Sequence, residues 1–158
     1  MRYLIKQKIF SLNDGFAIKD ESGNDCFKVK GKFISFGKKL TIFGMDGKEE
    51  CFIQQKPIRI FPEYHILKDS HKMMVIKQKF SLLGKKFSIS GDAGDYLIEG
   101  NLSARNFNII KNGTVIAAIS KKLLALADTY TVDISEGEVP SLMLGAAVVL
   151  DMICNEPK

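Results

Sequence analysis

Residues 139–154 read VPSLMLGAAVVLDMIC and, as a helix, present no polar face before Asp151. Pro140 suits the first helical position, where its missing N–H would be unpaired anyway, and the alanine and leucine content favours a helix over a strand. A helix that is apolar on every side has to be enclosed by protein or by a membrane. Residues 141–153 would measure about 20 Å, whereas a bilayer span takes roughly 20 apolar residues. We therefore predict a helix over residues 141–153 that is enclosed by protein.

The length of 158 residues suits one domain, 1–158, whose core needs neither disulfides nor a metal. The three cysteines, Cys26, Cys51 and Cys154, are odd in number and far apart, which is typical of buried thiols in a reducing compartment. Residues 1–12 alternate apolar and basic side chains instead of forming the apolar run of a secretory signal. We expect a cytoplasmic protein without a transmembrane segment.

Short apolar or alternating runs fill the chain up to about residue 135, separated by turn residues at fairly even spacing. This pattern is typical of a mainly β protein, either a sandwich or a barrel, and no amphipathic helix interrupts it. Pro57 and Pro62 bracket residues 58–61. Because proline is confined to edges and irregular positions of a sheet, the strand that runs to Leu67 is expected to be an edge strand or irregular.

An internal repeat divides this β region into two halves, about 3–67 and 72–135. The sequence IKQKIFSL of residues 5–12 recurs as IKQKFSL at residues 76–82, and the hairpin signals Asp46-Gly47 and Asn112-Gly113 follow in the same order. Matching landmarks in register favour a duplication. Two halves of about six strands can close into a twelve-stranded antiparallel barrel, too wide for its own side chains to fill. The apolar C-terminal helix is the candidate to fill it.

Four segments of the sequence carry a resemblance to a known family: residues 3–8 (YLIKQK), 27–32 (FKVKGK), 128–134 (DTYTVDI) and the apolar helix that ends in Asp151. Over essentially the whole chain, the sequence resembles the LURP-one-related proteins, which are grouped with tubby C-terminal domains and phospholipid scramblases. The resemblance implies a closed twelve-stranded barrel around a buried C-terminal helix. It also suggests contact with membranes or phosphoinositides, as an analogy at the level of the fold.

Catalytic and metal-binding motifs are absent from the sequence. Only His65 and His71 could serve as an imidazole base or ligand, and no nucleophile-elbow, zinc-protease, dinucleotide or P-loop motif occurs. Glu136 and Glu138 precede the expected helix, where negative charge would favour a helix N-terminus. Paired carboxylates of a glycosidase are conceivable in this region, but spacing does not support them. We expect no catalytic residues, no metal and no cofactor.

Five lysines form the candidate anion-binding site: Lys28, Lys30, Lys32, Lys38 and Lys39. Alternation along a strand would place the first three on one face and Phe27, Val29 and Phe33 on the other, inner face. Lys38 and Lys39 would add charge at the following turn. Residues 1–90 hold 18 Lys/Arg against 9 Asp/Glu, which favours a basic surface in this part. The alternative is that these lysines only keep the strand soluble and unpaired at its edge.

Two classes of function follow from these features. The first is a non-enzymatic binding domain for an anionic membrane surface or phospholipid headgroup, which would make the protein peripheral at membranes. The alternative is a cytosolic protein-interaction or scaffold domain with no lipid role. Nucleic acid is not expected as a partner, because the chain has no tryptophan and its other aromatic residues belong to expected strands.

Overall fold

Twelve strands and one helix form the part of the chain that the computed structural model describes, residues 1–6, 15–34, 37–121 and 129–155. In chain order the elements are β1 (Arg2–Lys6), β2 (Phe16–Asp20), β3 (Asp25–Ile34), β4 (Gly37–Gly44), β5 (Glu49–Gln55), β6 (Glu63–Lys68), β7 (His71–Lys79), β8 (Lys86–Gly91), β9 (Gly94–Asn101), β10 (Asn106–Lys111), β11 (Thr114–Ser120), β12 (Thr129–Ile134) and α1 (Pro140–Asn155).

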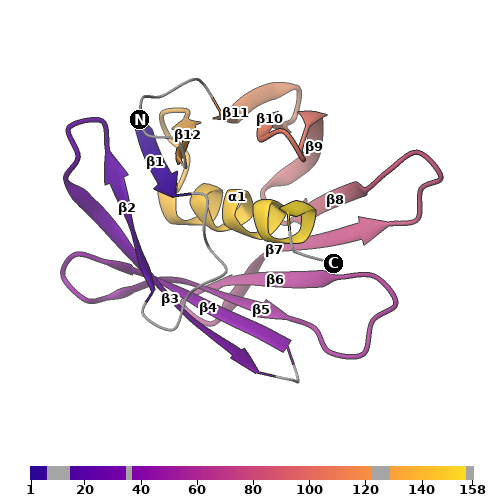
Figure 1. Ribbon diagram of the computed structural model, residues 1–158, viewed down its shortest axis with the longest axis horizontal. Coiled ribbons are helices and arrows are strands. Elements are labelled where there is room, and N and C mark those ends of the chain that lie inside the picture. The colour runs from indigo at the N-terminus through magenta and orange to yellow at the C-terminus, as the bar shows by residue number, and fades with distance from the viewer. Residues whose placement is uncertain (7–14, 35–36, 122–128, 156–158) are drawn as a thin grey trace.

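The strands form one closed antiparallel barrel in which each strand pairs with its neighbours in sequence and β1 pairs with β12 (Figure 1). This architecture confirms the predicted closed twelve-stranded fold. The expected edge at β6 is wrong, because β6 hydrogen-bonds to both β5 and β7. Both prolines precede the strand, since residues 56–62 connect β5 to β6. The expected irregularity is present as a register shift between Ile66 and Leu67.

The internal repeat stays a prediction. The recurring segment begins in β1 and in β7, where Ile5 and Ile76 are both fully buried. Most of its first copy, residues 7–12, lies outside the described residues.

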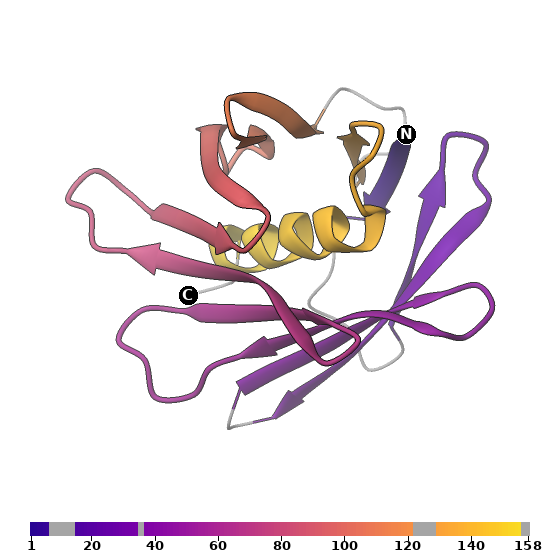
Figure 2. The same cartoon turned by 180° about the vertical axis from the view of Figure 1, so that it is seen from behind.

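Helix α1 lies inside the barrel, as both views of the ribbon show (Figures 1 and 2). It packs against β5, β6, β7 and β12, and its side chains from Leu142 to Ile153 are buried, whichever way they point. Gly145 allows a close approach to the wall, because a Cβ there would lie 3.4 Å from Cys51 Sγ. The prediction of a helix enclosed by protein is confirmed, with two residues more at the C-terminal end and one more at the start. At 16 residues α1 is shorter than a bilayer span, and the described ranges contain no other helix.

An ion pair fixes the C-terminal half of α1 to the barrel. The guanidinium of Arg105 donates to the carboxylate of Asp151, and both residues are buried. The same guanidinium lies 5.9 Å from the centre of the Tyr130 ring, on β12. Lys85 Nζ donates to the carbonyl oxygen of Ile153 over 2.6 Å. Because Arg105 and Asp151 are 46 residues apart, their contact depends on the assembled barrel and could not be predicted from spacing.

Glu138 precedes the N-terminal end of α1, as expected, and has a structural contact. The helix begins at Pro140, and its first turn contains no acidic residue. Glu138, two residues before it, forms an ion pair with Lys111 at the end of β10. The carboxylate therefore contributes to the contact between the segment that leads into the helix and the barrel wall.

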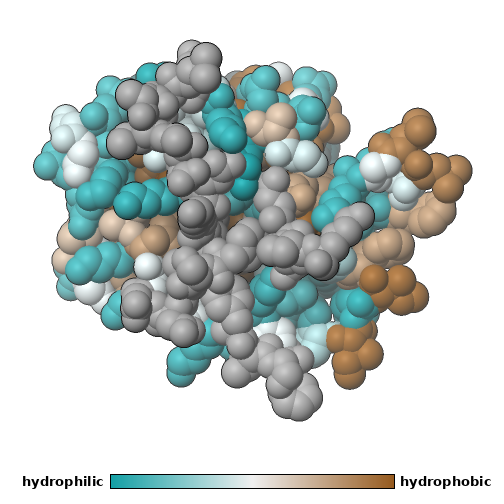
Figure 3. All heavy atoms as spheres, in the orientation of Figure 1, coloured by the Kyte–Doolittle hydropathy of each residue, from teal (hydrophilic) through white to brown (hydrophobic). Residues whose placement is uncertain are grey.

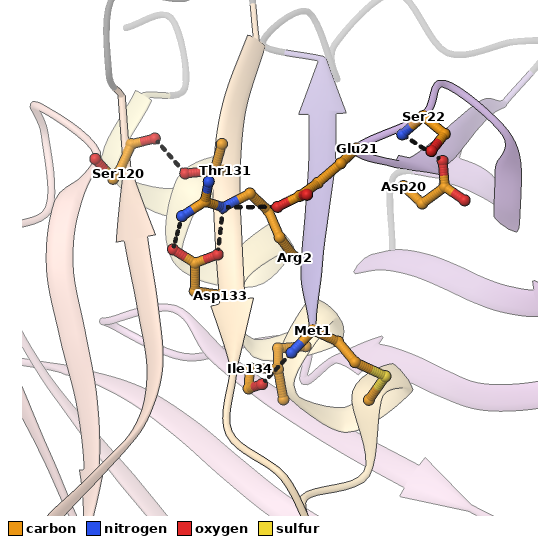
Figure 4. Close-up of polar contacts among 9 residues, drawn as sticks. All are labelled: Met1, Arg2, Asp20, Glu21, Ser22, Ser120, Thr131, Asp133 and Ile134. Carbon is orange, nitrogen blue, oxygen red and sulfur yellow. Dashed lines mark hydrogen bonds and ion pairs between the residues drawn. The ribbon is translucent and has the colours of Figure 1, made fainter.

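The seam between the first and last strands is closed by polar contacts (Figure 4). Arg2 binds Asp133 with both ends of its guanidinium fork, Nε to Oδ1 at 2.6 Å and Nη2 to Oδ2 at 3.1 Å. Arg2 Nε also lies 3.5 Å from Glu21 Oε1. The amino group of Met1 donates to the carbonyl oxygen of Ile134 over 2.8 Å. Met1 is thus held against the end of β12.

Candidate functional site

Strand β3 presents Lys28, Lys30 and Lys32 on the outside of the barrel, where all three are exposed. Val29, between the first two, is buried in the core. The predicted alternation along this strand is therefore confirmed for the residues whose side chains the structure describes. Phe27 is partly buried and packs against the core, while the side chain of Phe33 lies outside the described part.

The neighbouring strands bring further side chains to the same outer face. In the register of β3 and β4, Lys32 lies opposite Lys39 and Lys30 lies opposite Thr41. In the register of β4 and β5, Thr41 lies opposite Phe52. Because directly opposite residues of a sheet share a face, these five side chains form one surface across three strands.

This surface is hollowed into a groove of about 680 Å³, which we call the lysine groove. It is lined by Gly15, Lys30, Gly31, Lys32, Lys39, Thr41, Phe43 and Phe52. Both phenylalanines are half-buried, and Lys30 Nζ lies 5.8 Å from the centre of the Phe43 ring, in reach of a cation–π interaction. The groove therefore combines three ammonium groups with two aromatic rings.

Among the residues that the structure describes, carboxylates do not pair with the lysines of the lysine groove. Within the described ranges, none of the ion pairs involves Lys28, Lys30, Lys32 or Lys39. The described residues of the lining include no histidine, cysteine or carboxylate. What the groove offers a ligand is thus positive charge, the Thr41 hydroxyl and aromatic surface, which suits an anion with an apolar part.

Lys38 lies in β4 and not in the predicted turn, and it does not line the lysine groove. It shares the phase of the buried residues Leu40 and Ile42 and is itself half-buried, so it lies on the inner face of β4 near the strand end. Its backbone N–H donates to Gln55 Oε1 over 3.0 Å. Burial lowers the pKa of the Lys38 ammonium group. Lys28 lies on the outer face, opposite Phe43, but does not line the groove.

The sequence prediction missed Thr41, Phe43 and Phe52. The signal that identifies them is the same alternation that placed the β3 lysines: Thr41 and Phe43 alternate with buried Leu40 and Ile42. Phe52 stands between buried Cys51 and Ile53. Large apolar residues on the outer phase of two adjacent strands are unusual on a barrel wall that faces water, and this combination is the reason to consider the surface a candidate site.

A second hollow, of about 600 Å³, lies at the seam beside Met1, Arg2, Asp20 and Glu21. Its polar groups are used in structural contacts (Figure 4). Asp20 accepts hydrogen bonds from the backbone N–H groups of Ser22 and Asn24, both at 2.9 Å. Arg2 binds Asp133. The described residues contain no group of three or more histidine, cysteine, aspartate or glutamate side chains that could hold a metal ion.

Both histidines make local contacts. His65 Nε2 lies 2.8 Å from Glu63 Oε1, and His71 Nδ1 lies 2.8 Å from the carbonyl oxygen of Asp69. Neither lines the lysine groove.

The thiols are expected to be unreactive in the folded protein. Cys51 is buried, while Cys26 and Cys154 are half-buried. Burial raises the pKa of the Cys51 thiol to about 12 and that of Cys154 to about 11, from 9.0 in each case. At neutral pH this leaves Cys51 with roughly a thousandfold less thiolate than an exposed cysteine. Alkylation followed by mass spectrometry should label Cys51 only after denaturation, and fast labelling of the native protein would contradict this.

A helix-filled, twelve-stranded antiparallel barrel with a basic outer groove is the class of protein that these features define. The family model described as LURP-one-related matches residues 1–151, and the chain belongs to this family. It is 33% identical, over 149 residues, to the uncharacterised protein YxjI of Bacillus subtilis (strain 168), covering 94% of this chain and 91% of that protein.

A solved structure supports the same fold. The X-ray structure of an Arabidopsis thaliana protein superposes with a TM-score of 0.62 over 94% of this chain and 86% of the other, at 14% identity. The family and the fold predicted from the resemblance are thus confirmed.

Proposed function

We propose that this protein is a non-enzymatic, peripheral binding domain whose lysine groove takes the headgroup of an anionic phospholipid. The observation that supports the proposal is the placement of Lys30, Lys32 and Lys39, outside every ion pair among the described residues, around two half-buried phenylalanines. An unbalanced cluster of ammonium groups favours a phosphate-bearing ligand. The rings favour a ligand with apolar carbon next to that charge.

The expected affinity is moderate and sensitive to salt. A lysine near an anionic membrane surface contributes about 1 kcal/mol, and this contribution falls off within a Debye length of about 8 Å at physiological ionic strength. Lys28 lies on the same outer face and adds to this attraction. Four lysines therefore give adsorption to anionic membranes that is strong at low salt and weaker at physiological salt. Adsorption to neutral membranes should be weak at any salt concentration.

Vesicle flotation tests the proposal. We expect the protein to float with vesicles containing phosphatidylserine or a phosphoinositide and to remain behind with pure phosphatidylcholine. The variant Lys30→Glu/Lys32→Glu should lose roughly tenfold or more in partitioning, because each reversal replaces an attractive charge with a repulsive one.

The matched control is Lys48→Glu/Lys72→Glu, which changes the net charge equally at two exposed positions outside the lysine groove. It should bind nearly as the wild type does. Equal loss in both variants would mean that net charge alone, and not the groove, drives adsorption. If the wild type fails to float with any vesicle at low salt, the lipid role is wrong and a protein-interaction domain is the better description.

A further inference from the structure

Two connections at one end of the barrel expose large apolar side chains. Residues 56–62 join β5 to β6 and residues 80–85 join β7 to β8. Ile58 is fully exposed, Ile60 is 95% exposed, and Leu82 and Leu83 are 88% and 92% exposed. We call the following set the apolar tip: Ile58, Ile60, Phe61, Phe80, Leu82 and Leu83.

The two connections lie next to each other, at the end of the barrel where α1 terminates (Figure 1). In the space-filling view their residues form the brown hydrophobic areas at the right-hand side (Figure 3). They are held to the barrel by specific contacts. The backbone N–H of Gln78, in β7, donates to the carbonyl oxygen of Pro62 over 3.0 Å. Lys85 donates to the last turn of α1.

The backbone conformation at Ile58 is unfavourable, so it does not explain why the apolar tip is exposed. Ile58 has a φ of 55°, in the left-handed region that β-branched residues avoid. An isoleucine that is fully exposed gains no burial in the free protein to offset this conformation. Six large apolar side chains on two adjacent connections also exceed the single exposed residues normal for a monomer. The feature therefore indicates a surface that is covered by something else.

Basic residues surround the apolar tip. Residues 56–63 and 77–86 contain these cations: Lys56, Arg59, Lys77, Lys79, Lys85 and Lys86. Glu63 is the only carboxylate in the two segments. It accepts a hydrogen bond from His65 at 2.8 Å and lies 3.6 Å from Arg59 and 3.8 Å from Lys77. The collar around the tip is therefore strongly positive, which is complementary to an anionic surface.

We propose that the apolar tip inserts into the boundary between headgroups and acyl chains of an anionic bilayer, with the basic collar against the headgroups. A fluid interface accepts projecting apolar side chains without a matching hollow, and apolar residues with flanking lysine and arginine are the composition of interfacial anchors. The inference rests on the proposed function and extends it by giving the barrel an orientation.

This orientation brings the lysine groove to headgroup depth. Lys39 lies opposite Gln54 in the sheet, and Gln54 precedes Lys56 by two residues, or about 7 Å along an extended chain. The edge of the groove and the apolar tip therefore belong to the same end of the barrel. A bilayer that takes up the tip would meet Lys32 and Lys39 at its surface.

Single tryptophan reporters test the insertion directly, since the chain contains no tryptophan. Leu83→Trp places the reporter in the apolar tip. Met45→Trp places it on the exposed turn between β4 and β5, at the other end of the barrel. With phosphatidylserine vesicles we expect the emission of Leu83→Trp to shift to shorter wavelength and to be quenched by brominated lipid, while Met45→Trp stays unchanged.

A binding variant supplies the second measurement. Leu82→Ser/Leu83→Ser removes two leucines whose side chains are almost fully exposed, so the fold should persist. We expect its partitioning to anionic vesicles to fall roughly tenfold or more, because less apolar area is buried in the membrane interface. Its far-ultraviolet circular dichroism and melting temperature should match the wild type.

Two outcomes separate the inference from the proposed function, and a third overturns both. If the wild type floats with anionic vesicles but Leu83→Trp keeps its emission and the double serine variant binds normally, the insertion is wrong and the headgroup role stands. If Leu83→Trp still shifts after Lys30→Glu/Lys32→Glu is added, and binding is unchanged, the insertion stands and the groove proposal fails. Absence of any vesicle binding by the wild type overturns both and favours a protein as the cover of the apolar tip.

Discussion

Replacing Ala147 by lysine is expected to unfold the protein. Ala147 is buried in the middle of α1, and the residues on either side of it are buried as well. A lysine there would place an unpaired ammonium group in the barrel interior, at a cost of several kcal/mol, which is comparable with the about 5–15 kcal/mol that stabilises a typical domain. Circular dichroism should show loss of the cooperative thermal transition.

The control for this prediction is Ala118→Lys. Ala118 is partly exposed on β11 and lies opposite Asp133 in the register of β11 and β12, so the same side chain there can reach water. We expect a melting temperature within a few degrees of the wild type for a surface change of this kind. A folded Ala147→Lys variant with unchanged melting temperature would show that the lumen tolerates charge.

Removing Asp151 should have the second largest effect. Asp151→Ala leaves the guanidinium of Arg105 buried without this carboxylate, and breaking a buried ion pair in this way costs about 3–5 kcal/mol. Denaturant unfolding of Asp151→Ala measures the loss. The double variant Arg105→Met/Asp151→Leu should lose less stability than Arg105→Met alone or Asp151→Leu alone, because neither charge is then left behind. Additive losses in this cycle would contradict energetic coupling between the two residues.

The main features of the fold could be predicted because they follow from local patterns of apolar and polar residues in the sequence. A helix without a polar face has to be enclosed by protein. A series of short strands with no other helix beside it can enclose the helix by closing into a barrel. Strand alternation in residues 27–32 placed the β3 lysines outside. These inferences depend on neighbouring residues, which the sequence displays directly.

The features that were missed depend on pairing between distant segments. Lys38 was assigned to the turn, but the register opposite Phe33 places it on the inner phase of β4. The outer aromatic surface requires β4 and β5 to lie beside β3, and the contact of Arg105 with Asp151 requires the helix to enter the barrel. The apolar tip could not be predicted, because leucine and isoleucine are assigned to the core by default and only the structure shows that these residues are exposed.

The seam between β1 and β12 also has a consequence for how the chain acquires its structure during synthesis. Arg2 and Asp133 are 131 residues apart, and the helix that supplies the middle of the core follows the last strand. The hairpins can form locally as they leave the ribosome, but without α1 they have nothing to close around. The ring can therefore be completed only after β12 and α1 have been synthesised, and until then the emerging sheet keeps both an open edge and an uncovered apolar face, the state in which nascent chains depend most on chaperones.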